Sequence, residues 1–156
     1  MLSTSRSVLV SAPREAVRLY LRDLANLAEY ERKVDRVQAS YPSPDTGFYE
    51  ASGRFAGLPW SGAFTVRFTK DGGFRSEMVR GPLKRLVGGF ALRSVSGGTL
   101  VTHDAQYLFP WPLRLLSPLL VRWLGRSIDL ELRAVKEGAE RLNRRLQQRE
   151  IETALQ

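Results

Sequence analysis

The chain has 156 residues, of which 24 are lysine or arginine and 16 aspartate or glutamate, a formal net charge of +8. This length suits one domain, and 43% hydrophobic with 26% charged residues is a globular composition. The sequence contains no cysteine, which excludes disulfides, thiol catalysis, iron–sulfur clusters and thiolate zinc sites. The single histidine, His103, also excludes a multi-histidine metal site, and we expect no cofactor.

The positive charge is spread along the chain, without a basic tail or a run of like charge. This dispersal favours a solvated cationic surface, and we expect no specific nucleic-acid binding. The start of the chain shows no apolar run of signal-peptide length, and no stretch of 18 apolar residues could form a spanning helix. The expected compartment is therefore the cytoplasm.

The N-terminal third predicts a strand, helix and strand in that order. Residues 5–11 alternate around valines, which indicates a strand. Pro13 suits a first helical position, and apolar residues then recur at helical spacing as far as Tyr30, as one helix or two short ones. A second strand is predicted over residues 33–41, before a turn rich in proline at 42–47.

The middle of the chain predicts repeated strands separated by short glycine-containing turns. Because parallel strands need long crossovers, these strands must pair in an antiparallel meander. The predicted strands are Phe48–Ala56, Ser61–Lys70, Phe74–Arg80, Arg85–Val95 and Thr99–Phe109.

A long amphipathic helix is predicted from Ser117, where Pro118 suits the first helical position. Packing of this helix on the chain's own sheet is favoured over a coiled-coil dimer, because the seam covers fewer than three heptads. We predict one domain over residues 1–149 and a frayed tail over 150–156. The apolar seam consists of Ile128, Leu132, Val135, Ala139, Leu142 and Leu146.

Three segments carry a resemblance to a known family: residues 10–30, the hairpin at 90–109, and the terminal helix. Together they resemble the START-like superfamily, in particular its polyketide cyclase/dehydrase and lipid-transport members. The resemblance implies an α+β helix-grip fold, a strongly curved antiparallel sheet of six to seven strands around the C-terminal helix, with short helices after the first strand. It also implies a cavity between sheet and helix for lipids, sterols, quinones, polyketides or plant-hormone-like molecules.

Alternation and the resemblance together assign residues to this cavity. His103 has two interpretations, a general acid or base, or a hydrogen-bonded structural histidine. Asp104 cannot orient it, since adjacent strand residues point to opposite faces. If the protein is an enzyme, we expect proton transfer by His103, Tyr107 or Glu77. The predicted ligand-binding residues are Trp60, Phe64, Met78, Phe90, His103, Tyr107, Trp111, Leu120, Trp123 and Leu124.

Two further features leave alternatives open. The apolar segment 111–124 is interpreted as core packing, as the mouth of the cavity, or as a surface that contacts a membrane. Gly125 follows it inside the predicted helix, where its small size leaves cavity space or admits an aromatic neighbour. A basic cluster surrounds the turn at Gly81 and forms either an anion site or a solvated loop; it consists of Arg75, Arg80, Lys84 and Arg85.

The leading functional hypothesis is a carrier or sensor of a small hydrophobic molecule, as a monomer or weak homodimer with transient membrane-surface contact. The second is a cyclase- or dehydratase-type enzyme acting on a polyketide-like substrate. The third is an interaction module for a ribosomal or respiratory partner, which the net charge of +8 would suit.

Overall fold

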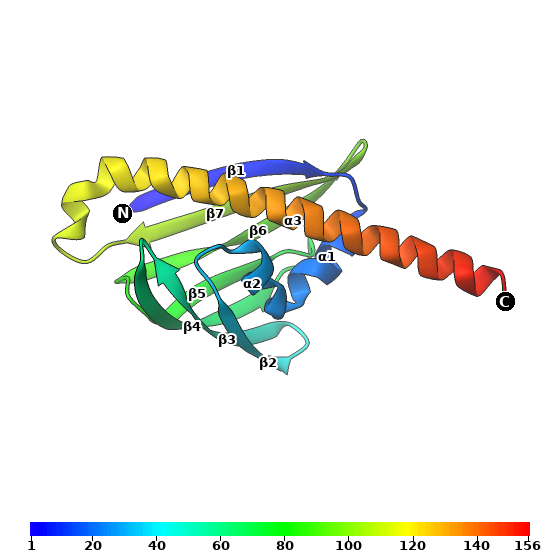
Figure 1. Cartoon of the computed structure of the whole chain (residues 1–156), viewed down its shortest axis with the longest axis horizontal. Coiled ribbons are helices and arrows are strands. Elements are labelled where there is room, and N and C mark those ends of the chain that lie inside the picture. The colour runs from blue at the N-terminus through cyan, green and yellow to red at the C-terminus, as the bar shows by residue number, and fades with distance from the viewer.

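The computed structural model describes all residues 1–156. A single long helix, α3, crosses one face of a curved antiparallel sheet, and two short helices lie beside it (Figure 1). The elements in chain order are β1 (Leu2–Val10), α1 (Arg14–Arg22), the 3-10 turn η1 (Leu24–Asn26), α2 (Leu27–Tyr30), β2 (Arg36–Ser43), β3 (Thr46–Phe55), β4 (Leu58–Phe68), β5 (Phe74–Arg80), β6 (Arg85–Val95), β7 (Gly98–Leu108), the 3-10 turn η2 (Leu113–Leu116) and α3 (Ser117–Ala154).

The sheet has seven strands in the order β1-β7-β6-β5-β4-β3-β2. Strands β2 to β7 form the predicted meander, and the hairpins turn at glycines such as Gly72 and Gly97, whose φ angles of +99° and +87° suit a residue without a side chain. Strand β1 joins the far edge by pairing with β7, with Leu2 opposite Tyr107 and Val10 opposite Thr99. The predicted helix-grip fold is confirmed.

The buried residues form two apolar clusters between the sheet and the helices. The main cluster has 22 buried residues and joins the inner face of the sheet to α1, α2 and the middle of α3. A smaller one combines Ala105, Tyr107 and Phe109 with Leu124 of α3. On β7, His103 lies between these clusters, since Val101 belongs to the first and Ala105 to the second.

Helix α3 is longer than the sequence predicts. It runs for 38 residues to Ala154, about 57 Å, whereas we expected a frayed tail from Glu150. No glycine or proline follows Gly138, so no residue that disfavours a helix ends it earlier. Its last turns, in orange and red in Figure 1, extend beyond the sheet. The apolar seam is buried from Ile128 to Ala139, and the remainder of it is only partly covered.

The structure also moves the start of the second strand. Residues 31–34 form a turn in which the Val34 backbone N–H donates to the Glu31 carbonyl at 3.0 Å, so β2 begins at Arg36 and not at Lys33. None of the helices combines the length and the apolar composition that crossing a bilayer requires.

Candidate functional site

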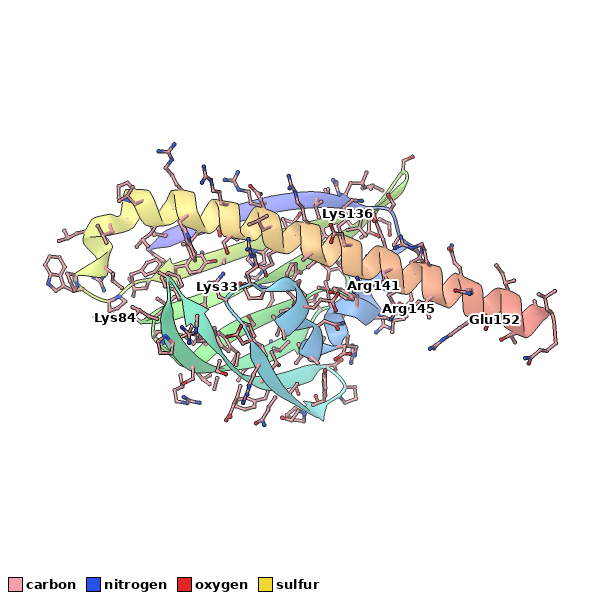
Figure 2. All side chains as sticks on the ribbon, in the orientation of Figure 1. Lys33, Lys84, Lys136, Arg141, Arg145 and Glu152 are labelled. Atoms are coloured by element: carbon pink, nitrogen blue, oxygen red, sulfur yellow. The ribbon has the colours of Figure 1, made fainter.

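Titratable side chains from three separate segments meet in the interior between the sheet and α3. Glu131 projects from α3 and is only 4% exposed, and His103 projects from the inner face of β7. Glu31 and Lys33 come from the turn between α2 and β2, and Figure 2 shows Lys33 between the sheet and α3. We call these four residues, together with Tyr30 at the end of α2, the polar cluster.

Short contacts hold the polar cluster together. The Lys33 Nζ atom lies 2.7 Å from Glu31 Oε1 and donates to the Ser127 hydroxyl of α3 at 3.1 Å. The Glu31 and Glu131 carboxyl groups share a hydrogen bond. His103 Nε2 lies 3.8 Å from Glu131 Oε1, beyond hydrogen-bond distance. The contacts therefore link the turn to α3 through one lysine and a pair of carboxyl groups.

Local sequence explains how these groups reach the interior. Glu131 follows Ile128 by three residues and precedes Val135 by four, so helical geometry places it on the buried face. The Lys33 backbone comes close to β3 because Gly53 has no side chain, and a Cβ there would lie 1.9 Å from the Lys33 carbonyl oxygen. The Trp60 indole N–H donates to that same oxygen at 2.9 Å, which fixes the turn.

Burial and charge shift the pKa values of the Glu131 and Glu31 carboxyl groups in opposite directions. Burial, reinforced by the charge of Glu31, raises the pKa of Glu131 well above its ordinary value. Burial also acts to raise the pKa of Glu31, but the charge and hydrogen bonds of Lys33 outweigh it and leave the pKa below its ordinary value. Glu131 is therefore the protonated member of the pair, and Glu31 the ionised one.

His103 is a neutral imidazole in this setting. Burial lowers its pKa from 6.5 to about 4, against the opposing charges of Glu31 and Asp104. Its ring packs edge-on against Phe90, with centroids 4.9 Å apart. The contact of His103 with Glu131 thus joins two uncharged groups and is not an ion pair.

Two polar atoms of this cluster have no hydrogen-bond partner. They are the hydroxyl of Tyr30, a residue only 1% exposed, and Nδ1 of His103. The Tyr30 ring is packed between Tyr20 and Phe90, and burial raises its pKa well above the ordinary value. An unpartnered buried polar group costs about 1–3 kcal/mol, so such groups call for an explanation.

The predicted ligand-binding residues divide into three sets by burial. The structure brings the buried ones together on the inner face and under α3, whereas the exposed ones lie at the N-terminal end of that helix. The buried residues are Phe64, Phe90, His103, Tyr107 and Leu124; Trp60, Met78 and Leu120 are half-buried; Trp111 and Trp123 are exposed at 69% and 39%.

The three predicted proton-transfer residues do not share one site. His103 belongs to the polar cluster, and Tyr107 lies in the smaller apolar cluster, stacked on Phe109 at 6.2 Å. Glu77 is exposed on β5, on the strand face opposite to the half-buried Met78. The structure therefore separates Glu77 from the interior.

Contacts on β1 and β7 bear on two alternatives that the sequence left open, the role of Arg75 in the basic cluster and the space beside Gly125. Arg75 forms an ion pair with Asp104 at 2.5 Å on the outer face, so it is not a free anion ligand. A Cβ on Gly125 would lie 2.8 Å from the Arg6 guanidinium of β1. Neither a cavity nor an aromatic ring therefore lies directly against Gly125.

Two surface hollows lie away from the polar cluster. One, of about 230 Å³, is on the outer face between Arg36, Glu50 and Arg80. The other, of about 480 Å³, lies along the end of α3 between Leu146 and Ala154. Neither is lined by predicted ligand-binding residues, so the interior site is argued from its polar groups.

Four members of the polar cluster were not expected from the sequence as site residues: Tyr30, Glu31, Lys33 and Glu131. Glu131 could have been found, because it interrupts an otherwise apolar helical face. The turn residues carry no such signal, since charged residues in a turn are usually solvated.

The solved structures that this chain resembles share its fold at low sequence identity. A protein of Thermus thermophilus superposes with a TM-score of 0.79 at 18% identity, over 88% of this chain and 97% of that one. The Zhui aromatase/cyclase of Streptomyces sp. R1128 superposes with a TM-score of 0.73 at 17% identity, over 90% of this chain and 94% of that one. A STAR-related lipid transfer protein fragment from Xanthomonas axonopodis superposes with a TM-score of 0.70 at 16% identity, over 88% of this chain and 85% of that one.

No curated protein matches the sequence. The family model described as polyketide cyclase / dehydrase and lipid transport matches residues 1–140, which contain the whole sheet and the buried part of α3. This match covers the first two segments that carried the resemblance and the first part of the terminal helix, and the solved structures agree with it in fold. The chain belongs to the polyketide cyclase/dehydrase and lipid-transport family.

Proposed function

We propose that this protein binds a small hydrophobic molecule with at least one polar group, between the sheet and α3, as a carrier or sensor. The observation that carries the proposal is the pair of unpartnered polar atoms, the Tyr30 hydroxyl and His103 Nδ1, where the polar cluster adjoins the main apolar cluster. The family description, which includes lipid transport, supports the hydrophobic part of the ligand. A polar group on the ligand would give these atoms their missing partners.

The surroundings define what such a ligand requires. Phe64 and Phe90 of the inner face offer aromatic surface, whereas the Tyr30 hydroxyl offers a hydrogen-bond donor. The neutral His103 offers a donor or an acceptor according to its tautomer. A carbonyl or hydroxyl group on a mostly apolar skeleton fits this combination.

The entrance is proposed at the N-terminal end of α3. Here the helix is held to the β3–β4 hairpin by the edge contact of Trp123 with Phe55, whose ring centroids are 4.8 Å apart. Lys33 lies beneath, with its ammonium 5.7 Å from the Trp123 ring centroid. Movement of these few side chains would open a path from the surface to the polar cluster.

Native mass spectrometry of the protein purified from cells tests the proposal by looking for a bound small molecule. The Tyr30→Phe variant sharpens the test, because it removes the unpartnered hydroxyl and keeps the ring. We expect this variant to retain about tenfold less ligand, and in its empty form to unfold at a higher temperature than the empty parent.

Tyr41→Phe is the matched control. The Tyr41 hydroxyl is fully used, since it accepts from the Leu24 backbone N–H at 3.0 Å and donates to the Arg22 carbonyl at 2.9 Å. Its loss should lower stability and leave ligand retention unchanged. Protein that carries no small molecule, together with a Tyr30→Phe variant no more stable than the parent, would contradict the proposal.

We also propose that the N-terminal end of α3 contacts an anionic membrane surface from which the ligand is drawn. This end exposes a group of large apolar side chains, and the exposed cations Arg122, Arg126 and Lys84 lie at the same end, as Figure 2 shows for Lys84. Such a combination binds to anionic lipid through both apolar burial and charge. The apolar residues are Leu58, Trp111, Leu113, Leu115, Leu116, Leu119 and Trp123.

Flotation with lipid vesicles tests this contact. We expect binding to phosphatidylcholine vesicles that contain phosphatidylserine, and roughly tenfold weaker binding after Leu115→Ser with Leu119→Ser. Ile151→Ser, at the exposed opposite end of α3, is the control and should leave binding unchanged. Equal loss in the control, or no binding to the anionic vesicles, would refute membrane contact at this end.

A further inference from the structure

We propose that Glu31 and Glu131 form an acid–base centre that moves a proton on the bound molecule, at a carbon next to a carbonyl group. This inference rests on the proposed function, because it needs a hydrophobic ligand beside Tyr30 and His103. It adds an activity and two residues that the sequence did not indicate.

The geometry supplies two carboxyl groups and one cation. Lys33 lies 2.7 Å from Glu31 Oε1 and neutralises that carboxylate. Glu131, whose side chain is more deeply buried, lies beside the neutral His103 and the Glu31 carboxyl, and the more distant influence of Lys33 does not outweigh its burial. Two carboxyl groups with one ammonium leave one proton to be held by the pair, and that proton resides on Glu131.

The unpartnered atoms give the second, independent observation. The Tyr30 hydroxyl is within the field of Glu131, Tyr49 and Glu31, and it has no acceptor. His103 Nε2 lies 3.8 Å from Glu131 Oε1, and its other ring nitrogen, Nδ1, has no partner. The polar cluster thus holds buried donors and acceptors without partners, which a ligand oxygen that develops charge could use.

The proposed step is balanced within the site. The Glu31 carboxylate takes a hydrogen from the α-carbon, so that a C–H bond breaks and an O–H bond forms. The electron pair moves to the carbonyl oxygen, and the Glu131 carboxyl donates its proton to that oxygen to give the enol. Return of a proton to a carbon completes an isomerisation or an exchange, without oxidant or reductant.

The hydrogen bond between the Glu31 and Glu131 carboxyl groups provides a path by which the pair returns to its resting protonation state. After the step Glu31 is protonated and Glu131 ionised, the reverse of the resting arrangement. Transfer of the proton from Glu31 to Glu131 restores the resting state, and exchange of the carboxyl protons with water allows a solvent hydrogen to return to the carbon. A purely structural role would need no such pair, since apolar residues of similar volume usually stabilise an interior at least as well as buried charges.

The test uses 1-tetralone, a hydrophobic ketone whose hydrogens beside the carbonyl exchange slowly. Proton NMR in D₂O follows the loss of that signal in the presence of the full chain, and line broadening of the aromatic protons reports binding. We expect exchange roughly 100-fold faster with the parent than with Glu31→Gln or Glu131→Gln. Glu137→Gln, the same change on an exposed face of α3, should exchange as fast as the parent.

The outcomes separate this inference from the proposed function. If the parent protein binds 1-tetralone but exchanges its hydrogens no faster than the Glu31→Gln variant does, the acid–base centre is refuted and the binding proposal stands. If 1-tetralone does not bind at millimolar concentration while a copurified molecule is found, the ligand class is not a ketone and the inference is again refuted. Should Glu131→Gln fail to fold, Glu31→Gln alone decides the result.

Discussion

The middle and the N-terminal end of α3 pack in opposite ways. From Ile128 to Ala139 the helix is flanked by α1 and α2, and its sheet-facing residues are buried. From Ser117 to Leu124 it covers only the smaller cluster and leaves Leu119 67% exposed. The comparison shows that the middle of the helix holds the fold together, whereas its N-terminal end is packed more loosely.

Two glycines of α3 mark this difference. Gly138 lies in the tightly packed region, where a Cβ would come within 2.2 Å of the Tyr20 ring of α1. Gly125 lies in the loosely packed region, where a Cβ would meet only the end of the flexible Arg6 side chain. The same substitution at these two positions therefore measures the contrast directly.

The largest effect on packing is expected from Gly138→Ala. The added methyl group must displace Tyr20, whose hydroxyl donates to Glu29 at 3.1 Å, so both the packing of α1 on α3 and this hydrogen bond are disturbed. We expect a loss of about 3 kcal/mol in the free energy of unfolding, measured by urea denaturation. A loss below about 0.5 kcal/mol would show that the packing of α1 on α3 is loose.

The next effect concerns the polar cluster and depends on pH. Glu131 is protonated in the folded chain but ionises near 4.5 in the unfolded chain, so the folded state binds more protons and the parent loses stability as pH rises above 4.5. Glu131→Gln removes this loss. We expect the variant to gain about 1.4 kcal/mol over the parent for each pH unit above 4.5, until the folded pKa is reached.

The contribution of His103 to the free energy of unfolding changes with pH in the opposite direction. Its pKa is about 4 in the folded chain and 6.5 when unfolded, so stability is lost as pH falls from 6.5 to 4. In the parent the two slopes oppose each other between pH 4.5 and 6.5, and only the His103 slope remains in Glu131→Gln. Urea unfolding at several pH values measures this, and a stability difference that is constant from pH 5 to 7 would contradict the assignment.

The smallest effect is expected from Gly125→Ala. Replacing glycine in the interior of a helix gains up to about 1 kcal/mol, and Arg6 can move aside into solvent. We expect a rise in melting temperature of roughly 2–4 °C for a chain of this size. A fall in melting temperature would mean that the contact of Arg6 with Asp129, 3.9 Å apart, matters more than helix propensity.

Local chemistry made most of the fold predictable. Hairpin glycines and alternating strands located β5 at 74–80 and β6 at 85–95, at the bounds that the structure shows. The pairing of β1 with β7 was not predicted, because no local signal specifies a partner nearly a hundred residues away. The length of α3 was underestimated, since its last turns have no apolar contact to reveal them.

The candidate site was less predictable for a physical reason. His103 and the aromatic residues of the inner face followed from strand alternation, which depends only on neighbours in sequence. The carboxyl pair depends on the contact of a turn with a distant helix. Glu131 alone is marked by its place on an apolar helical face, but Glu31 looks like a solvated turn residue. Only the three-dimensional fold shows that Glu31 and Glu131 are neighbours.

The edge position of β1 has a consequence for synthesis on the ribosome. Strand β1 emerges before the rest of the sheet, but it pairs only with β7, which ends at Leu108, and otherwise contacts α3, which follows β7. At about 5–20 residues per second, Leu2–Val10 therefore remains roughly 5–20 seconds without a sheet partner. The polar run at residues 3–7, which includes Arg6, suits this delay, because a polar strand is slow to aggregate.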